Sequence, residues 1–207
     1  KWHFETKGRD REDLPDYKFK ADITFCFSQS GMAEYYHNSS FLEYGGSPDK
    51  AVDIAFSSLI HSFIKEKNKY NKNEKRVTFT DIKDSLILVT NTYSTVTSYE
   101  NQTKKAITNK FIQEAMTAFL KEKLEVYFIE NQKDLERIIE QVLINKRSRE
   151  KAELTRTDVR KKLSKGIDNF SNKVKKFVDC RTKDVSRREL FIVEGDSALG
   201  STKMGRD

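Results

Sequence analysis

The feature that most constrains the fold of this chain is a change in the spacing of its apolar residues. Between Tyr17 and Ser28, apolar and polar residues alternate, and this period of two predicts a half-buried strand. Between Phe111 and Leu143, apolar residues recur every three or four positions, which predicts two long helices interrupted at Asn131. A chain that combines strands with separate helical runs is expected to adopt an α+β fold.

Shorter signals predict the other elements of this domain. Residues 3–16 are predicted to be a charged, turn-like opening, and residues 32–41 a second strand that forms a hairpin with the first. Ser47 is the expected N-cap of a helix that has Pro48 at its first position. A continuous apolar run within residues 84–93 predicts a strand that is covered on both faces.

The second long helix continues with little apolar content. Basic residues dominate from Lys146 to Lys162, so this part is either a solvated helix face or a surface that passes near a polyanion. Gly166 is expected to end the helix.

Composition narrows the class of protein. The 14 Phe and 8 Tyr argue against disorder, because disordered segments contain few aromatic residues. The net charge of +7 favours a polyanionic partner such as DNA or ATP, although a lysine-rich protein without such a partner has the same balance. The two cysteines, Cys26 and Cys180, form neither a disulfide framework nor a metal motif, and Cys26 is expected to be a buried thiol.

The sequence also leads to expectations about the cellular location of the protein and about whether the chain is part of a longer one. No apolar run approaches the roughly 20 residues that span a bilayer, and the start has no signal-peptide pattern. We therefore expect a cytoplasmic protein without a membrane partner. Because the chain begins at Lys1 rather than at Met, we expect it to be a piece of a longer protein.

The C-terminal segment carries the clearest chemical signature. Residues 189–193 are predicted to form a buried strand that ends at Glu194, Gly195 and Asp196. Open α/β sheets present metal and phosphate chemistry in this way, and the glycine permits a sharp turn. A simpler role for Glu194 is that of an acidic residue at the start of a helix. The pattern divides the chain into residues 1–172 and the beginning of an α/β domain over residues 173–207.

Four motifs, in this order, resemble the DNA gyrase B family of type IIA topoisomerases. The first three are Gly45-Gly46-Ser47, Gln102-Thr103-Lys104 in a loop before a long helix, and Val178-Asp179-Cys180. The fourth resembles the opening of the metal-binding TOPRIM domain shared by type II topoisomerases and primases, and comprises Glu194-Gly195-Asp196-Ser197-Ala198, Gly200-Ser201, Lys203, Gly205 and Arg206. Leu199 departs from this family, which usually has glycine there.

The resemblance implies a fold and a set of roles. The fold would be a transducer domain like ribosomal protein S5 domain 2, with long C-terminal helices, followed by the first strand of an α/β TOPRIM domain. Gln102 and Lys104 would contact the γ-phosphate of ATP held by an adjoining ATPase domain. Glu194 would bind Mg²⁺ or act as general acid during DNA cleavage. Asp196, Lys203 and Arg206 would be candidates for contacts with DNA.

The resemblance also implies an enzyme larger than this chain. An A-type subunit would supply the catalytic tyrosine, and the ATPase domain would mediate a homodimer. The whole enzyme would use ATP to pass one DNA duplex through a break in another, whereas this fragment alone is expected to be inactive.

Three alternatives remain open. The chain could belong to a B-type subunit of topoisomerase IV, or to a non-catalytic nucleic-acid-binding module that reuses the fold. A primase-like or nuclease-like metal domain is the third, and the Gln102-Thr103-Lys104 loop argues against it. In isolation, Lys104 could simply keep an exposed loop soluble, and Lys203 and Arg206 could be exposed residues of a helix.

Overall fold

The computed structural model describes residues 1–168 and 176–205, with residues 164–168 described by their backbone alone. Two compact units are present, Lys1–Lys151 and Ala152–Asp207. The boundary expected between residues 172 and 173 stays a prediction. No helix among the described residues has the length and apolar character needed to cross a membrane.

The first unit is built on a five-stranded mixed sheet with the strand order β1-β2-β5-β3-β4. Strand β5 pairs antiparallel with β2 and parallel with β3. Parallel neighbours require a crossover, which the helices between β4 and β5 provide. The strands are β1 (Trp2–Gly8), β2 (Tyr17–Phe27), β3 (Met32–His37), β4 (Ser40–Phe41) and β5 (Leu86–Ser94).

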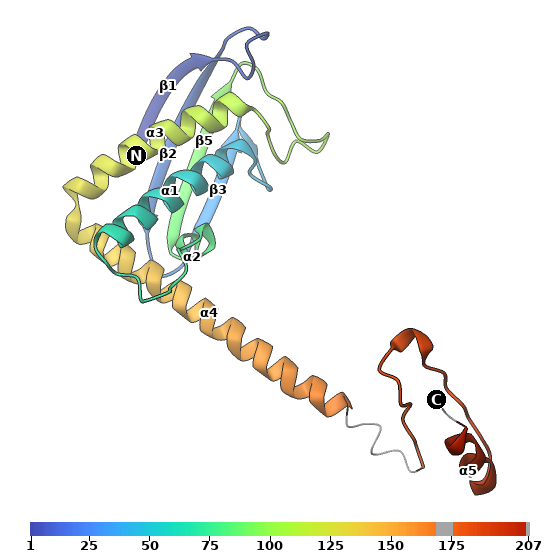
Figure 1. The fold of residues 1–207 in the computed structure, drawn as a ribbon. Coiled ribbons are helices and arrows are strands. Elements are labelled where there is room, and N and C mark those ends of the chain that lie inside the picture. The colour runs from blue at the N-terminus through green and yellow to red at the C-terminus, as the bar shows by residue number, and fades with distance from the viewer. Residues whose placement is uncertain (169–175, 206–207) are drawn as a thin grey trace. The chain divides into compact units, whose positions relative to one another are not determined.

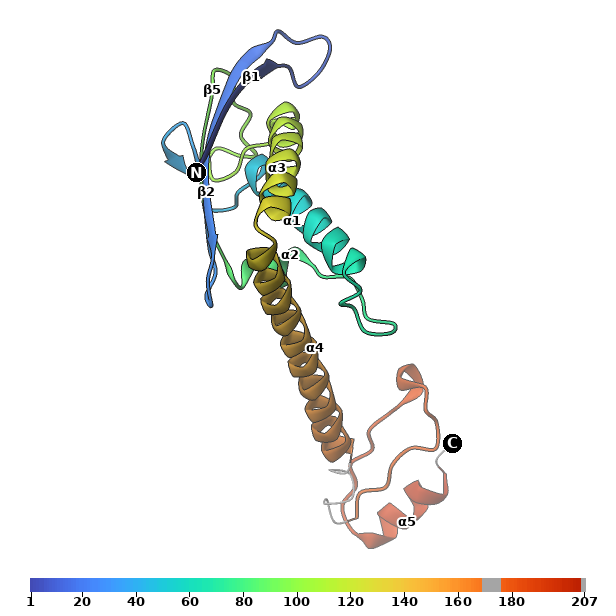
Figure 2. The same cartoon turned by 90° about the vertical axis from the view of Figure 1, so that its left-hand side faces the viewer.

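Helices α1 (Ser47–Glu66) and α3 (Lys110–Glu130) cover one face of this sheet, as Figures 1 and 2 show. A short helix, α2 (Phe79–Lys83), precedes β5, and α4 (Gln132–Asp168) follows α3. The core forms where one face of β2 meets the apolar stripes of the helices. Its fully buried members include Phe19, Ala21, Ile23, Val52, Phe56, Ile60, Ile112, Met116, Leu120 and Leu124.

The two main periodicities are confirmed. Burial alternates along β2, as a period of two requires. The two helical stripes form α3 and the start of α4, and Asn131 separates the two helices. The α+β class is therefore confirmed for residues 1–168.

The opening of the chain was wrongly predicted. Residues 2–8 form edge strand β1 rather than a turn-like segment. Its half-buried residues include the aromatic Trp2 and Phe4, and the Phe4 ring stacks on Phe119 with centroids 4.1 Å apart. Its outward residues are His3, Glu5 and Lys7, and such charged side chains are usual on the exposed side of an edge strand.

The predicted hairpin between the first two long strands is also wrong. Strand β5 lies between β2 and β3, so these sequence neighbours do not pair. The second strand is shorter than expected because Asn38 and Ser39, with φ of 45° and 67°, turn the chain into β4. Strand β5 itself is not covered on both faces, since its residues alternate between buried and half-buried.

Three smaller predictions need correction. Cys26 is exposed because it lies on the outer face of β2. The N-cap of α1 is Gly46 rather than Ser47, which is buried and donates its hydroxyl to the Ile107 carbonyl at 3.1 Å. Helix α4 continues past Gly166 to Asp168.

The second unit contains a 3₁₀ turn, Val185–Arg187, and helix α5 (Asp196–Met204). The strand predicted for residues 189–193 is not formed in the described part of the chain, and Ile192 is 88% exposed. A strand is stabilised by hydrogen bonds to a neighbour, and residues 176–205 contain no partner strand. The prediction of a buried strand over residues 189–193 is therefore wrong for the described chain.

The start of α1 is held against the segment that precedes α3. Gly46 forms a parallel bridge with Ile107, and the Ser47 N–H donates to the Ile107 carbonyl at 2.9 Å. Gly46 has φ of 87°, and a Cβ there would lie 2.2 Å from the Ile107 oxygen. Only glycine allows this backbone conformation together with this close approach.

His37 joins the end of β3 to β5 and to the segment that follows β5 through two side-chain hydrogen bonds. Its Nδ1 lies 2.9 Å from the Thr92 hydroxyl and its Nε2 lies 2.9 Å from the Thr97 hydroxyl. The side chain is fully buried, and this burial lowers the pKa of His37 from 6.5 to about 4. The neutral ring is therefore the form that the fold favours.

We predict that Gly46→Ala destabilises the first unit by about 2 kcal/mol or more, because the methyl group cannot share space with the Ile107 carbonyl. Urea denaturation would measure the change in the free energy of unfolding. Gly200→Ala is the matched control, since a Cβ at Gly200 meets nothing within 4 Å. Equal stabilities of the two variants would contradict the steric argument.

We further predict that acid weakens the fold through His37. Because its pKa is lowered in the folded state, its contribution is complete above pH 6.5 and is lost as the pH falls towards about 4. The expected loss between about pH 7.5 and about pH 5.5 is about 1 kcal/mol in the free energy of unfolding. Chemical denaturation of the wild type and of His37→Gln would check this, and an equal pH slope in both would exclude His37 as the cause.

Candidate functional site

Gln102 and Lys104 lie together at the tip of the long loop between β5 and α3, which Figure 1 shows at one end of the sheet. Backbone hydrogen bonds close the stem of this loop, from Thr108 to the Ser98 carbonyl at 2.8 Å and from Glu100 to the Ala106 carbonyl at 3.0 Å. Residues 101–104 are all exposed. The loop therefore presents both predicted residues to solvent from an ordered stem.

The two neighbouring lysines of the tip have different surroundings. The Lys104 Nζ lies 5.6 Å from the centroid of the Tyr99 ring, and Lys104 has φ of 57°. Lys105 forms an ion pair with Glu43, which raises the pKa of Lys105, and its Nζ lies 5.5 Å from the centroid of Tyr44. Lys105 thus ties the loop to the strand–helix junction, whereas the Lys104 ammonium has no carboxylate partner among the described residues.

The base of the loop is fixed by Asp10. One oxygen of Asp10 accepts from the Tyr17 hydroxyl at 3.0 Å and from the Phe111 N–H at 2.8 Å. The other accepts from the buried Asn109 amide at 2.8 Å. Burial, together with the hydrogen bond to Asp10, raises the pKa of Tyr17 and keeps its hydroxyl protonated as the donor. This carboxylate thereby satisfies an orphan N–H at the start of α3.

The second group of predicted residues lies in the second unit. Glu194 is exposed and directly precedes Gly195, which has φ of 86° and begins α5. Asp196 is in the first turn of α5 and forms an ion pair with Lys176, and Lys203 is in the last turn. Arg206 lies outside the described residues.

The oxygen donors of this group suit Mg²⁺, which binds few carboxylates and retains several water molecules. Asp196 forms an exposed ion pair with Lys176, whereas no ion pair of Glu194 is present among the described residues. Within residues 1–168 and 176–205, no group of three or more His, Cys, Asp or Glu is arranged to hold a metal ion. The residues present could thus supply part of a magnesium site.

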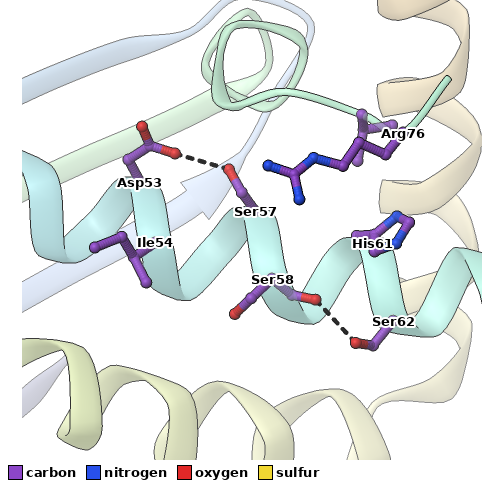
Figure 3. Close-up of a pocket in the computed structure, with 8 residues that line it drawn as sticks. Asp53, Ile54, Ser57, Ser58, His61, Ser62 and Arg76 are labelled. Atoms are coloured by element: carbon purple, nitrogen blue, oxygen red, sulfur yellow. Dashed lines mark hydrogen bonds between the residues drawn. The ribbon is translucent and has the colours of Figure 1, made fainter.

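A groove of about 500 Å³ lies along α1 beside Arg76 and includes none of the predicted site residues (Figure 3). The Ser57 hydroxyl donates to Asp53 at 2.9 Å, and the Ser62 hydroxyl donates to the Ser58 carbonyl at 3.0 Å. Both hydroxyls therefore hydrogen-bond within α1 itself.

Sequence reasoning missed three residues that position the candidate site. Asp10 fell in a predicted turn, Glu43 was unremarked, and Tyr99 lay in a polar stretch. Asp10 contacts Asn109 and Glu43 contacts Lys105 across most of the domain, whereas Tyr99 contacts Lys104 within the loop itself. No local spacing in the sequence could have indicated these pairs, although the Gly45-Gly46-Ser47 motif does contact the loop stem through Ile107.

Comparison with known proteins gives a consistent family assignment. The family described as DNA gyrase B matches residues 2–158. The DNA gyrase B protein of Metamycoplasma arthritidis is 34% identical over 178 residues, which are 86% of this chain and 27% of that protein. The corresponding protein of Streptococcus pyogenes serotype M3 is 28% identical over 204 residues, or 99% of this chain and 31% of that protein.

Solved structures show the same fold. The 43K ATPase domain of Thermus thermophilus gyrase B, in complex with an aminocoumarin, has a TM-score of 0.57 at 17% identity, over 76% of this chain and 41% of that one. The topoisomerase IV ATP-binding domain of Francisella tularensis also has a TM-score of 0.57, at 21% identity, over 63% of this chain and 36% of that one.

The chain spans about a quarter to a third of the length of the gyrase B relatives that it matches. The family match covers most of the chain, and the sheet with its long helices has the fold of the solved structures. This chain therefore belongs to the DNA gyrase B family and contains the transducer region of such a protein.

Proposed function

We propose that this chain couples the state of bound ATP to DNA strand passage in a gyrase-B-like type II topoisomerase. The observation that carries the proposal is the loop tip, where Gln102 and Lys104 are exposed on a stem that is bonded to α1. A sensor of this kind must reach out of its own domain and still be connected to rigid elements inside it. The loop has both properties.

Lys104 has the chemistry that a phosphate sensor needs. Its ammonium is a compact positive charge with three donors, and it lies 5.6 Å from the centroid of the Tyr99 ring. The Gln102 amide adds neutral donors beside it. We propose that both contact the γ-phosphate of ATP in an adjoining ATPase domain and are released on hydrolysis, as in other phosphate-ordered switches.

Glu194 is proposed to act in DNA cleavage. Its carboxylate would bind Mg²⁺, or its protonated carboxyl group would donate a proton to the departing deoxyribose oxygen, and the metal would supply Lewis-acid stabilisation of that oxygen. The remaining ligands would come from water and from other parts of the longer protein. Exposure of Glu194 at a glycine turn supports this role, because a ligand can approach it closely.

DNA and an A-type subunit that carries the attacking tyrosine are the proposed partners, with a homodimer formed through the ATPase domain. Lys203 is exposed and is the best-placed described candidate for a phosphate contact. Asp196 is a weaker candidate because Lys176 already occupies it. Arg206 remains a candidate from sequence alone.

A second candidate is a B-type subunit of topoisomerase IV. The gyrase and topoisomerase IV structures match this fold with the same TM-score of 0.57, so the fold favours neither. Supercoiling and decatenation assays on the full-length protein with its A-type partner would separate the two activities.

In the full-length protein, Lys104→Ala is expected to lower ATP turnover about tenfold or more, because a charge-assisted contact to the reacting phosphate is lost. ATP-independent DNA cleavage should remain mostly intact. Steady-state ATP hydrolysis and a DNA cleavage assay would measure the two. Lys110→Ala is the matched control, since Lys110 is an exposed residue at the start of α3 paired with Glu114. Parallel loss of both activities in Lys104→Ala would contradict the sensor role.

Glu194→Ala is expected to have the converse effect. Magnesium-dependent DNA cleavage should fall about a hundredfold, as for removal of a group that stabilises developing charge, while ATP turnover persists. Glu189→Ala, an exposed acid in the same segment, is the control. Cleavage by Glu194→Ala at the rate of this control, across a magnesium titration, would rule the proposed role out.

A further inference from the structure

Helix α4 packs on the rest of the first unit through a buried apolar stripe that includes Leu135, Ile139 and Val142, and two polar attachments lie at the ends of this stripe. The first is Asn131, the single residue between α3 and α4, whose N–H and side-chain amide both donate to the Tyr127 carbonyl, at 2.9 and 2.8 Å. The second is formed by Lys146 and Arg147, which bind the segment that follows α1. Fifteen residues of helix separate the two places, or about 22 Å at 1.5 Å per residue.

Glu74 is the centre of the second attachment. Its Oε1 accepts from Lys146 Nζ at 3.2 Å and from Arg147 Nε at 3.1 Å, and its Oε2 accepts from Arg147 Nη2 at 2.9 Å and from the Asn71 N–H at 2.7 Å. The Glu74 side chain is 7% exposed and that of Lys146 is 1% exposed. Arg147, followed by Asn71 and Lys146, lowers the pKa of Glu74 to about 2. Lys146 thus forms a buried ion pair with Glu74, and the half-exposed Arg147 adds a bidentate pair that fixes the orientation of the carboxylate.

A second acidic residue, Asp81, binds the same part of α4 close to the Glu74 contact. The fully buried Asp81 accepts from Arg149 Nε at 2.8 Å and, through its backbone carbonyl, from the Asn145 amide at 3.0 Å. Asp81 also accepts from the Thr78 N–H at 2.8 Å and so caps α2. Residues 145–149 of α4 are therefore held by the carboxylates of Glu74 and Asp81 and by the Asp81 carbonyl, all in the chain segment between α1 and β5.

Helix α1 connects this attachment to the candidate sensor loop. At its start, Gly46 and Ser47 are bonded to Ile107 in the loop stem. At its other end, Lys67 donates to Gln132 at 3.2 Å and the chain continues into the Glu74 segment. The 20 residues of α1 span about 30 Å, and a buried stripe runs along the helix, so it can only move as a unit.

We propose that Glu74 is a positioning residue that sets the direction of α4 about Asn131 and so passes movement of α1 on to α4. Helix α3 is followed by Asn131, whose φ of −115° and ψ of 57° depart from helical values, so contacts along α4 fix the angle between the two helices. The buried stripe and the attachment at Glu74 supply these contacts, and Glu74 supplies the one that lies farther from Asn131. The source of the movement of α1 rests on the proposed function, because the loop that carries Gln102 and Lys104 is hydrogen-bonded to the start of α1.

The test uses the full-length protein with its A-type partner and compares ATP turnover with the number of strand passages per ATP. Glu74→Gln keeps the shape of the side chain and removes its charge. We expect ATP turnover to stay within about twofold of the wild-type value. The number of strand passages per ATP should fall about fivefold or more, which is the lower end of the usual effect of coupling between two sites. Glu74→Asp, which keeps the charge, should restore part of the coupling.

Glu122→Gln is the matched control, because Glu122 pairs with Lys123 on the exposed face of α3. A general loss of stability would lower both activities together, whereas loss of positioning lowers only their ratio. An unchanged ratio in Glu74→Gln, or a parallel fall of both activities, would overturn the proposal.

Hydrogen exchange separates this proposal from the proposed function. In Glu74→Gln, amides of residues 132–151 should exchange about tenfold faster or more while those of β2 and β5 keep their protection. Unchanged protection of α4 would refute the positioning role. If the wild-type protein shows no ATP-dependent strand passage, the proposed function fails, and the exchange result still decides the role of Glu74.

Discussion

The backbone contact between Gly46 and Ile107 is the constraint on which the rest of the first unit depends. It joins the start of α1 to the stem of the loop that carries Gln102 and Lys104, two segments about 60 residues apart in the chain. Because a Cβ at Gly46 would lie 2.2 Å from the Ile107 oxygen, the contact requires a residue without a side chain. Through it, the exposed loop tip and the buried stripe of α1 become parts of one rigid assembly.

Three carboxylates then organise the helices around this assembly. Asp10 receives the N–H at the start of α3, Asp81 caps α2 and binds α4, and Glu74 binds two adjacent basic residues of α4. Each accepts hydrogen bonds from residues far away in the sequence, and Asp81 and Glu74 are largely buried. Unpaired, such charges would be costly to bury, so each holds its partners in a defined place.

The sequence predicted helices and strands well where one face of the element is buried. It predicted them poorly where the neighbouring strand in the sheet determines whether and how a segment pairs. The alternation in β2 and the stripes in α3 and α4 were recognised because burial repeats with the geometry of the element. Strand β1 was missed because its outward residues are charged, and the insertion of β5 between β2 and β3 reversed the expected pairing. The exposed residues 189–193 failed as a strand because the described chain offers them no neighbour.

By itself, the sequence determined the α+β class, the break between α3 and α4 at Asn131, the family, and the residue types of the candidate site. These follow from local periodicity and from short motifs, which need no knowledge of distant neighbours. Only the tertiary structure decided the strand order, the anchoring of the loop at Ile107 and the ionic attachment of α4 at Glu74. The physical reason is that hydrogen bonds and ion pairs act over a few ångströms in space. The residues that they join lie far apart in the chain, with 60 positions between Ser47 and Ile107 and 72 between Glu74 and Lys146.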